Sequence, residues 1–227
     1  QELGGKSALI MTDDADLNAA VEYGLEDVLI NTGQTCTAFS RWLIPESKVT
    51  EISKLILDKI SDYKIGSDES AFVGPMVTSA QQQRVLSYIQ TGIDEGANVL
   101  CGGLEMPDHL QHGFYVKPTV FTQVKNSMRI AQEEIFGPVV CLIPYSEIDQ
   151  AIEIANDSPY GLSSAVFSQT TEQGITIAKG IDAGMTYVNG GDYNIEAPFG
   201  GVKQSGNGCE FGDHGLNEYI ELQAIHV

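Results

Sequence analysis

A cysteine in a loop of small residues and a glutamate far before it are the residues of this chain whose types best suit covalent chemistry. Cys36 follows Gly33 and Gln34 in a predicted turn after a helix, where small neighbours would let its sulfur face a cleft. A thiolate attacks carbonyl carbon and leaves again readily once a neighbour has taken its proton. Glu2 could be that base if its surroundings bring its pKa toward neutrality. Taken alone, such a cysteine is more often structural and such a glutamate a surface or capping acid.

Three separated segments combine into a more specific pattern. They are Glu2-Leu3-Gly4-Gly5-Lys6, then Asn31-x-Gly33-Gln34-x-Cys36 with Ser40-Arg41 after it, and Glu134-x-Phe136-Gly137-Pro138. Read singly, the last segment is a turn with a core ring. Together, and with Glu2 lying 34 residues before Cys36, the segments resemble the signature of the aldehyde dehydrogenase superfamily over essentially the whole chain.

The resemblance assigns a role to each segment. It implies that Cys36 is the nucleophile and Glu2 the general base, while Glu134 binds the nicotinamide ribose and Phe136 lies beside the nicotinamide. The Leu3 backbone would contribute to the same cofactor site. Gln81 falls where the family often contacts that ribose, although a glutamine-rich helix face over residues 81–83 explains it almost equally well.

A late glycine-rich segment extends the resemblance to the substrate side. Pro198-Phe199-Gly200-Gly201-x-Lys203-x-Ser205-Gly206-x-Gly208 is similar to a family segment in which Phe199 would line the aldehyde entrance, with Thr35 and Thr37 beside the nucleophile. We expect its glycines to permit tight turns rather than to bind phosphate, because no helix start is expected after them. Cys209 stands where the family commonly has Arg, which leaves the docking of the tail open.

The implied reaction is NAD(P)-dependent oxidation of a small-molecule aldehyde to a carboxylic acid. It would pass through a thiohemiacetal and a thioester on Cys36, with hydrolysis by water that Glu2 activates. The family's dinucleotide-binding domain is absent from this sequence, so we expect the chain alone to be inactive and not to bind NAD or NADP. Two alternatives stay open: a thiol-dependent esterase or hydrolase, and a non-catalytic structural or oligomerisation module.

Alternating strand and helix patterns would position these residues. Strands are predicted at 7–11, 41–44, 97–100 (buried), 139–143, 163–167 and 185–188, and a loop at 102–117. Apolar spacing predicts helices from a cap at 12–16 to residue 28 or 30, and at 48–63, 79–95, 148–156 and 172–181. This alternation predicts an α/β fold, a largely parallel sheet with helices on both faces.

The end of the chain has a different character. Eight glycines between residues 190 and 215 predict a long loop, and residues 219–225 alternate in part like an edge strand. Such a terminal strand usually pairs elsewhere, so we expect a homo-oligomer. We divide the chain into a catalytic domain, 1–203, and a C-terminal tail with an oligomerisation strand, 204–227.

Composition excludes some partners. A net charge of -19, from 31 acidic and 12 basic residues, disfavours nucleic acid and anionic lipid surfaces. No apolar run approaches the roughly 18 residues of a membrane-spanning helix. Four scattered cysteines without CxxC spacing predict no metal site and favour a reducing compartment, the cytoplasm. Residue 1 is Gln, and we expect the chain to be part of a longer protein whose N-terminal portion is the dinucleotide-binding domain.

Overall fold

A seven-stranded, mostly parallel sheet forms the centre of the protein. The computed structural model describes residues 1–110 and 112–227. The strands are β1 (Ala8–Met11), β2 (Arg41–Pro45), β3 (Asn98–Cys101), β4 (Thr119–Thr122), β5 (Val139–Tyr145), β6 (Tyr160–Gly161), β7 (Ser163–Phe167), β8 (Met185–Val188) and β9 (Val202–Lys203). Their order in the large sheet is β3-β4-β5-β2-β1-β7-β8, with β3 the antiparallel edge, and β6 pairs with β9 separately.

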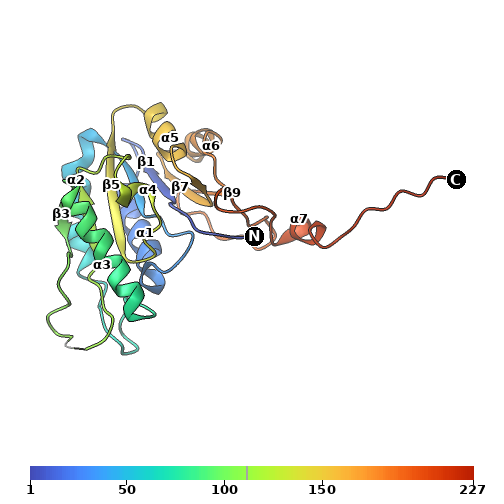
Figure 1. Cartoon of the computed structure of the whole chain (residues 1–227). Coiled ribbons are helices and arrows are strands. Elements are labelled where there is room, and N and C mark those ends of the chain that lie inside the picture. The colour runs from blue at the N-terminus through green and yellow to red at the C-terminus, as the bar shows by residue number, and fades with distance from the viewer. Residues whose placement is uncertain (111) are drawn as a thin grey trace.

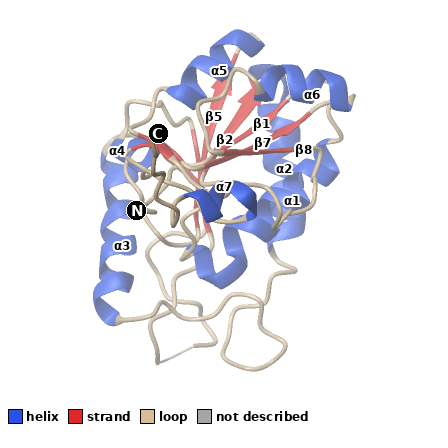
Figure 2. Ribbon diagram, turned by 90° about the vertical axis from the view of Figure 1, so that its right-hand side faces the viewer, coloured by secondary structure: helices blue, strands red, loops and turns tan. Residues whose placement is uncertain are grey.

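Helices cover both faces of this sheet. They are α1 (Leu17–Leu29), α2 (Val49–Ile60), α3 (Ser79–Asp94), α4 (Arg129–Gln132), α5 (Ile148–Asn156), α6 (Thr171–Ala178) and α7 (Gly212–Asn217), with the short 3-10 turns η1 (Ile30–Gly33) and η2 (Glu46–Lys48). Figure 2 shows α1 and α2 on one side of the strands and α3 and α4 on the other. The predicted α/β fold is therefore confirmed.

Strand β1 shows why the sheet has two cores. Its residues are all buried, yet Ala8 and Ile10 pack into the cluster under α3 to α6, whereas Leu9 and Met11 pack into the cluster under α1 and α2. Successive side chains of a strand point to opposite faces, so a strand covered on both sides reads as a continuous apolar run. The predicted cap of α1 also forms, since the Asp16 side chain accepts the Ala19 N–H at 3.1 Å.

The order of strands places three segments of the chain together. Glu2 precedes β1, Cys36 precedes β2 and Glu134 precedes β5, and these strands are parallel neighbours in the order β5-β2-β1. Segments that lead into adjacent parallel strands reach the same edge of the sheet. The fold itself therefore brings the N-terminal segment, the cysteine loop and the 134–138 segment to one edge.

Several predicted elements differ from the structure. The strand expected to be buried at 97–100 lies at 98–101 on the sheet edge, where Asn98 and Val99 are exposed. The 190–215 segment contains β9 and the start of α7, so a short helix does follow the glycines at 200–208. Most of the predicted loop at 102–117 has no helix or strand, and residue 111 of it lies outside the described residues.

The first residues after position 203 lie in the folded body. Ser205 is fully buried, its hydroxyl donates to Gly4 O at 2.8 Å, and it accepts the Gly161 N–H at 2.9 Å. The predicted boundary after residue 203 therefore falls inside the folded body. Only the residues after α7 leave that body, as an extended tail that points away from the N-terminus (Figure 1). The structure of the single chain assigns no strand to this tail, and the pairing of the tail with another subunit stays a prediction.

Candidate active site

A left-handed turn at the end of α1 positions Cys36. Asn31, Thr32 and Gly33 have φ angles of 50°, 59° and 68°. Each non-glycine residue in this region costs roughly 1–2 kcal/mol, and such strain persists only where the surroundings enforce it. Here the side chains of Asn31 and Gln34 bond to each other's carbonyl oxygens at 2.8 and 3.1 Å. The turn leads directly to Cys36, which is half-buried.

Close backbone approaches join the three segments. A Cβ on Gly33 would lie 2.3 Å from the carbonyl of Gly137, and one on Gly5 would lie 2.4 Å from Cys36 O. In addition, the Gly5 N–H donates to Glu134 Oε1 at 2.9 Å. The cysteine loop therefore packs directly against both of the other segments, and glycine is needed at these two positions because a side chain has no room.

The surroundings of Cys36 keep its thiol protonated at rest. Burial is the largest cause of its raised pKa, and the carboxylates of Glu134 and Glu2 raise that pKa further. The N–H groups of Cys36 and Thr37 act in the opposite sense by hydrogen bonding. A neutral thiol is a weak nucleophile, so a nearby base is required for chemistry. The same shifts place Glu2 and Glu134 within electrostatic reach of the sulfur.

The late glycine-rich segment holds Glu2. The Leu3 N–H donates to Ser205 O at 2.8 Å, and Glu2 pairs with Gly206 in an isolated antiparallel bridge. The carboxyl of Glu2 is exposed, and its pKa is raised by desolvation and by Glu210, and lowered by the amino terminus. Glu210 was missed in the sequence, although it follows the unusual Cys209 directly.

Glu134 and Phe136 lie in a turn that Gln81 stabilises. The Gln81 amide donates to Ile135 O at 3.2 Å and to Phe136 O at 2.8 Å, and Phe136 has a left-handed φ of 60°. Gln81 therefore supports the turn through its Nε2. Within the described residues, the hydrogen bond of Glu134 uses Oε1 only, and Oε2 stays available as an acceptor. A carboxylate with a free oxygen can accept hydrogen bonds from hydroxyl groups such as those of a ribose.

An aromatic cluster lies on the Glu2 side of the site. Phe199 pairs with Glu210 through two backbone hydrogen bonds of 2.8 and 2.7 Å. The rings of Phe199 and Tyr193 each pack edge-on against Phe211 at 6.2 Å. Desolvation raises the pKa of Tyr193, and Glu2 and Glu210 add to that shift. Tyr193 and Phe211 were missed because an aromatic residue in a glycine-rich loop carries no periodic signal.

The remaining predicted substrate residues flank the nucleophile. Thr35 and Thr37 are both half-buried. Leu3 is 52% exposed, so its side chain adds little packing and its backbone makes the contact with Ser205.

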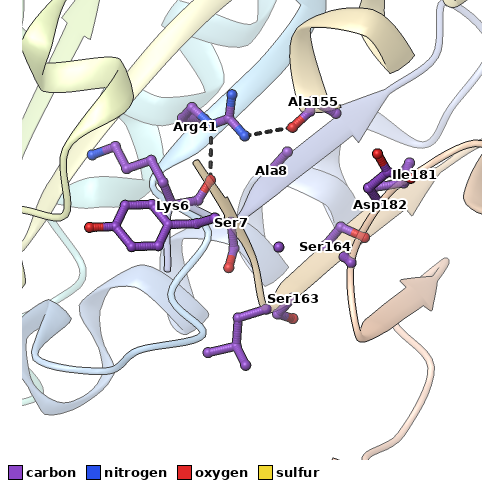
Figure 3. Close-up of a pocket in the computed structure, with 13 residues that line it drawn as sticks. Lys6, Ser7, Ala8, Arg41, Ala155, Ser163, Ser164, Ile181 and Asp182 are labelled. Atoms are coloured by element: carbon purple, nitrogen blue, oxygen red, sulfur yellow. Dashed lines mark hydrogen bonds between the residues drawn. The ribbon is translucent and has the colours of Figure 1, made fainter. Parts of the chain in front are cut away.

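Buried Arg41 ties two of the segments to the framework. Its guanidinium donates to Lys6 O and to Ala155 O, each at 2.9 Å (Figure 3), and also to Ile154 O at 2.9 Å. These bonds connect the start of β2 with the N-terminal segment and with the end of α5. The small cavity beside them holds about 10 Å³, which is too little for an organic substrate, and we assign it to the framework.

The described residues hold neither a metal-ligand cluster nor a membrane-spanning helix. Within residues 1–110 and 112–227, no group of three or more His, Cys, Asp or Glu side chains is arranged to hold a metal ion. No helix in the same ranges is long and apolar enough to cross a membrane.

Comparison with known proteins finds relatives along nearly the whole chain. The model of the aldehyde dehydrogenase family matches residues 1–225. A 3-succinoylsemialdehyde-pyridine dehydrogenase from a Pseudomonas species is 45% identical over 226 residues, which are 99% of this chain and 47% of that protein. The chain thus spans about half the length of the curated relatives it matches.

Solved structures agree with the fold over nearly the whole chain. A mutant aldehyde dehydrogenase C from Pseudomonas syringae, in complex with NAD+ and octanal, superposes with a TM-score of 0.95 at 44% identity, covering 97% of this chain and 46% of that one. An aldehyde dehydrogenase from Mycobacterium tuberculosis, in complex with NAD+, gives a TM-score of 0.93 at 43% identity, covering 96% of this chain and 45% of that one.

Proposed function

The chain belongs to the aldehyde dehydrogenase family, and from that premise we propose that it is the catalytic part of a longer protein that oxidises an aldehyde to a carboxylic acid. The observation that carries the proposal is the meeting of three segments at one sheet edge, with Gly5 in contact with Cys36 O and hydrogen-bonded to Glu134. A nucleophile, a base and a cofactor-binding carboxylate are the parts that the reaction needs.

In the proposed first stage, Cys36 Sγ adds to the aldehyde carbon while the thiol proton passes to the Glu2 carboxylate. A C–S bond forms and the carbonyl oxygen becomes the oxyanion of a thiohemiacetal. The Cys36 N–H, which already faces the sulfur, donates to that oxyanion together with a donor from outside this chain. When bound, NAD or NADP accepts the hydride from the substrate carbon.

In the second stage, Cys36 carries a thioester. Once the thiol proton has left Glu2 for solvent, Glu2 takes a proton from water, the hydroxide attacks the acyl carbon, the C–S bond breaks, and the carboxylic acid leaves as the thiolate is restored. Desolvation and Glu210 raise the pKa of Glu2, which makes its carboxylate a stronger base than an ordinary surface glutamate. Glu210, which contributes to that shift, offers a second carboxylate to receive the proton.

The nucleotide and the substrate are assigned by the same proposal. Glu134 would hold the nicotinamide ribose, with Phe136 beside the ring and Gln81 and Leu3 supporting them. Thr35, Thr37 and Phe199 would line the substrate pocket. NAD+ in the complexes of two similar enzymes supports the choice of cofactor. We also propose that the full-length protein forms homo-oligomers through the C-terminal tail. It would work in a reducing cellular compartment.

Substitution of the cysteine tests the assignment. In the full-length protein, Cys36→Ser should lower aldehyde-dependent NAD reduction by about 10³-fold or more, because a hydroxyl is a far weaker nucleophile than a thiolate. Cys101→Ser is the matched control, since Cys101 is also half-buried but lies on β3. Near-normal turnover of Cys36→Ser would refute the nucleophile.

Substitution of the base separates the two stages. At a pH above the raised pKa of Cys36, where the thiol ionises without help from Glu2, Glu2→Gln should give a burst of about one reduced cofactor per site followed by slow turnover, because the thioester accumulates when water is not activated. A thiol hydrolase would instead cleave esters through Cys36 and Glu2 and give no reduced cofactor from an aldehyde. A full-length protein without either activity would favour a non-catalytic structural module.

A further inference from the structure

Asp27 binds the loop that carries the proposed nucleophile. This residue lies in the last turn of α1, and its Oδ2 accepts the Phe39 N–H at 2.7 Å. Phe39 is three residues after Cys36 and is almost fully buried. A carboxylate that accepts a backbone N–H forms a charge-assisted hydrogen bond, about twice as strong as a neutral one. Neither the proposed mechanism nor the segments described above use Asp27.

Phe39 is held from three directions. Its carbonyl accepts the Trp42 Nε1–H at 2.8 Å. Its ring stacks on Tyr23 of α1 at 5.9 Å and meets the edge of Tyr187 of β8 at 6.2 Å. Of these contacts, only the bond to Asp27 involves a charged group. The loop between Cys36 and β2 is therefore anchored at Phe39. Among these contacts, the hydrogen bond to Asp27 is the one whose strength changes when the carboxylate is protonated.

The negative charge of the Asp27 carboxylate is poorly compensated by its surroundings. Burial raises its pKa to about 7, which the Phe39 N–H only partly opposes. The titratable groups that face it are Tyr23 on the same helix and Tyr187 on β8, and Asp27 raises the pKa of both in turn. Within the described residues no ion pair reaches Asp27. A nearby Lys or Arg would have kept it ionised well below neutrality.

We propose that Asp27 is a positioning residue for Cys36: its ionised carboxylate fixes Phe39 and thereby the direction of the thiol and of the Cys36 N–H. This inference rests on the proposed function of Cys36. Asp27 acts through geometry rather than through the acidity of the thiol, because the carboxylates that raise the pKa of Cys36 are those of Glu134 and Glu2. Misplacement of a reacting group by about 1 Å can cost about 10²-fold in rate.

The geometry gives the anchor a pH dependence. Above its pKa the carboxylate accepts the Phe39 N–H with full charge, and below it the neutral acid is a weaker acceptor. The loop should therefore be most ordered above about pH 7. Asn keeps an acceptor oxygen at the same place without titrating, whereas Ala leaves a buried N–H without a partner.

The test uses the full-length protein and three variants, Asp27→Asn, Asp27→Ala and the control Glu26→Gln. Glu26 neighbours Asp27 on α1 but is exposed, so its substitution removes the same charge without touching the loop. Hydrogen exchange is followed in peptides spanning residues 34–42, corrected for its intrinsic pH dependence, together with kcat, KM and alkylation of Cys36 by iodoacetamide.

We expect Asp27→Ala to raise exchange at Phe39 about tenfold and to lower kcat about tenfold, as loss of one buried acceptor implies, with KM for NAD unchanged. Glu26→Gln should match the wild type. Between pH 8 and pH 6 the wild type should lose protection in this loop severalfold, while Asp27→Asn, a neutral acceptor, should show a constant level close to that of the wild type at pH 6. The pH at which the alkylation rate is half-maximal should be the same in all four proteins.

Two results would overturn the proposal. One is equal exchange in Asp27→Ala and Glu26→Gln, and the other is an unchanged pH response in Asp27→Asn. If Asp27→Ala does not fold, Asp27→Asn still decides the question. Failure of the proposed function would appear separately, as wild-type protein without aldehyde oxidation, and the exchange measurements would then still report on the anchor.

Discussion

Lys6 is fully buried beside the cysteine loop, and its ammonium group has no hydrogen-bond partner within the described residues. Its pKa is lowered to about 8, chiefly by desolvation, and the nearby Arg41 guanidinium acts in the same direction. The carboxylates of Glu134 and Glu133 oppose the shift without reversing it. Folding therefore disfavours the charged form of this lysine, which costs stability at neutral pH.

Replacing this lysine should stabilise the chain in a pH-dependent way. A folded pKa below the unfolded value means that the unfolded chain binds more protons between about pH 8 and 10.5, so wild-type stability rises with pH there. Lys6→Met removes that dependence. We expect its advantage over the wild type, in free energy of unfolding by urea, to be about 2.5 kcal/mol larger at pH 7 than at pH 10.

The control for this measurement is Lys54→Met, because Lys54 is exposed on α2. It should change the free energy of unfolding by less than about 0.5 kcal/mol at either pH. If the gain in free energy of unfolding of Lys6→Met does not vary with pH, burial does not shift the pKa of Lys6.

At the residue scale, sequence reasoning found groups with recognisable chemistry and missed groups that act through contacts. Cys36, Glu2 and Glu134 were predicted because thiol and carboxylates occur in segments that resemble a family. Asp27 could not be predicted, because its importance comes from a hydrogen bond to Phe39 across 12 positions of chain. Gln81 was predicted as a ribose contact, and in the structure its side chain donates to the carbonyls of residues 135 and 136.

The turn between α1 and β2 is the element on which the site depends most directly. Gly33 has a positive φ and packs against the Gly137 carbonyl. Gly33→Ala must therefore both strain the backbone and separate the cysteine loop from the cofactor turn. We expect it to lower kcat/KM of the full-length protein at least about tenfold, and to destabilise the chain by about 2–4 kcal/mol in thermal or urea unfolding.

Gly103→Ala is the matched control, because Gly103 also has a positive φ, of 104°, but a Cβ there meets nothing within 4 Å. It should lose about 1 kcal/mol of stability from backbone strain alone and keep its activity. Equal effects of the two substitutions would show that the packing of Gly33 on Gly137 is unimportant.

Helices and strands with a clear hydrophobic periodicity were predictable from the sequence. Short strands that depend on pairing with distant parts of the chain were not. Helices α1, α3 and α5 were predicted to within one or two residues, because their apolar faces repeat at helical spacing. Strand β4 was missed, since four residues after a proline carry no period and gain their structure by pairing with β3 and β5. Strand β9 likewise exists only through its bonds to β6.

At the scale of the whole molecule, the chain offers only one end of a dinucleotide site. Glu134, Phe136 and the Leu3 backbone would contact the nicotinamide end, and the adenine and phosphate contacts would come from another domain. We expect calorimetry to give a Kd for NAD weaker than about 1 mM for this chain alone and about micromolar for the full-length protein. Glu134→Gln in the full-length protein should weaken binding, and micromolar affinity of the isolated chain would contradict the proposal.

The tail after α7 contributes little to the folded body. Its apolar residues Tyr219, Leu222 and Ile225 are 82%, 98% and 79% exposed. Deletion of residues 219–227 should therefore change the free energy of unfolding of this chain by less than about 0.5 kcal/mol, but should reduce the oligomer mass of the full-length protein in light scattering, because exposed apolar segments mark contact surfaces.

Leu222→Asp should reproduce the loss of mass, and Glu221→Gln should not. An unchanged oligomer after deletion would exclude the tail as the subunit contact.

The alignment of β5, β2 and β1 has a consequence for how the chemistry tolerates variation. Arg41 stands opposite Ala8 on one side and Cys141 on the other. If one of these strands slid past its neighbour by a single residue, its attached reactive group would travel about 3.3 Å, farther than the length of a hydrogen bond. The register of these three strands thus sets the distances between the sulfur and the carboxylates. A chain that folded with one strand out of register would lose activity while keeping its helices.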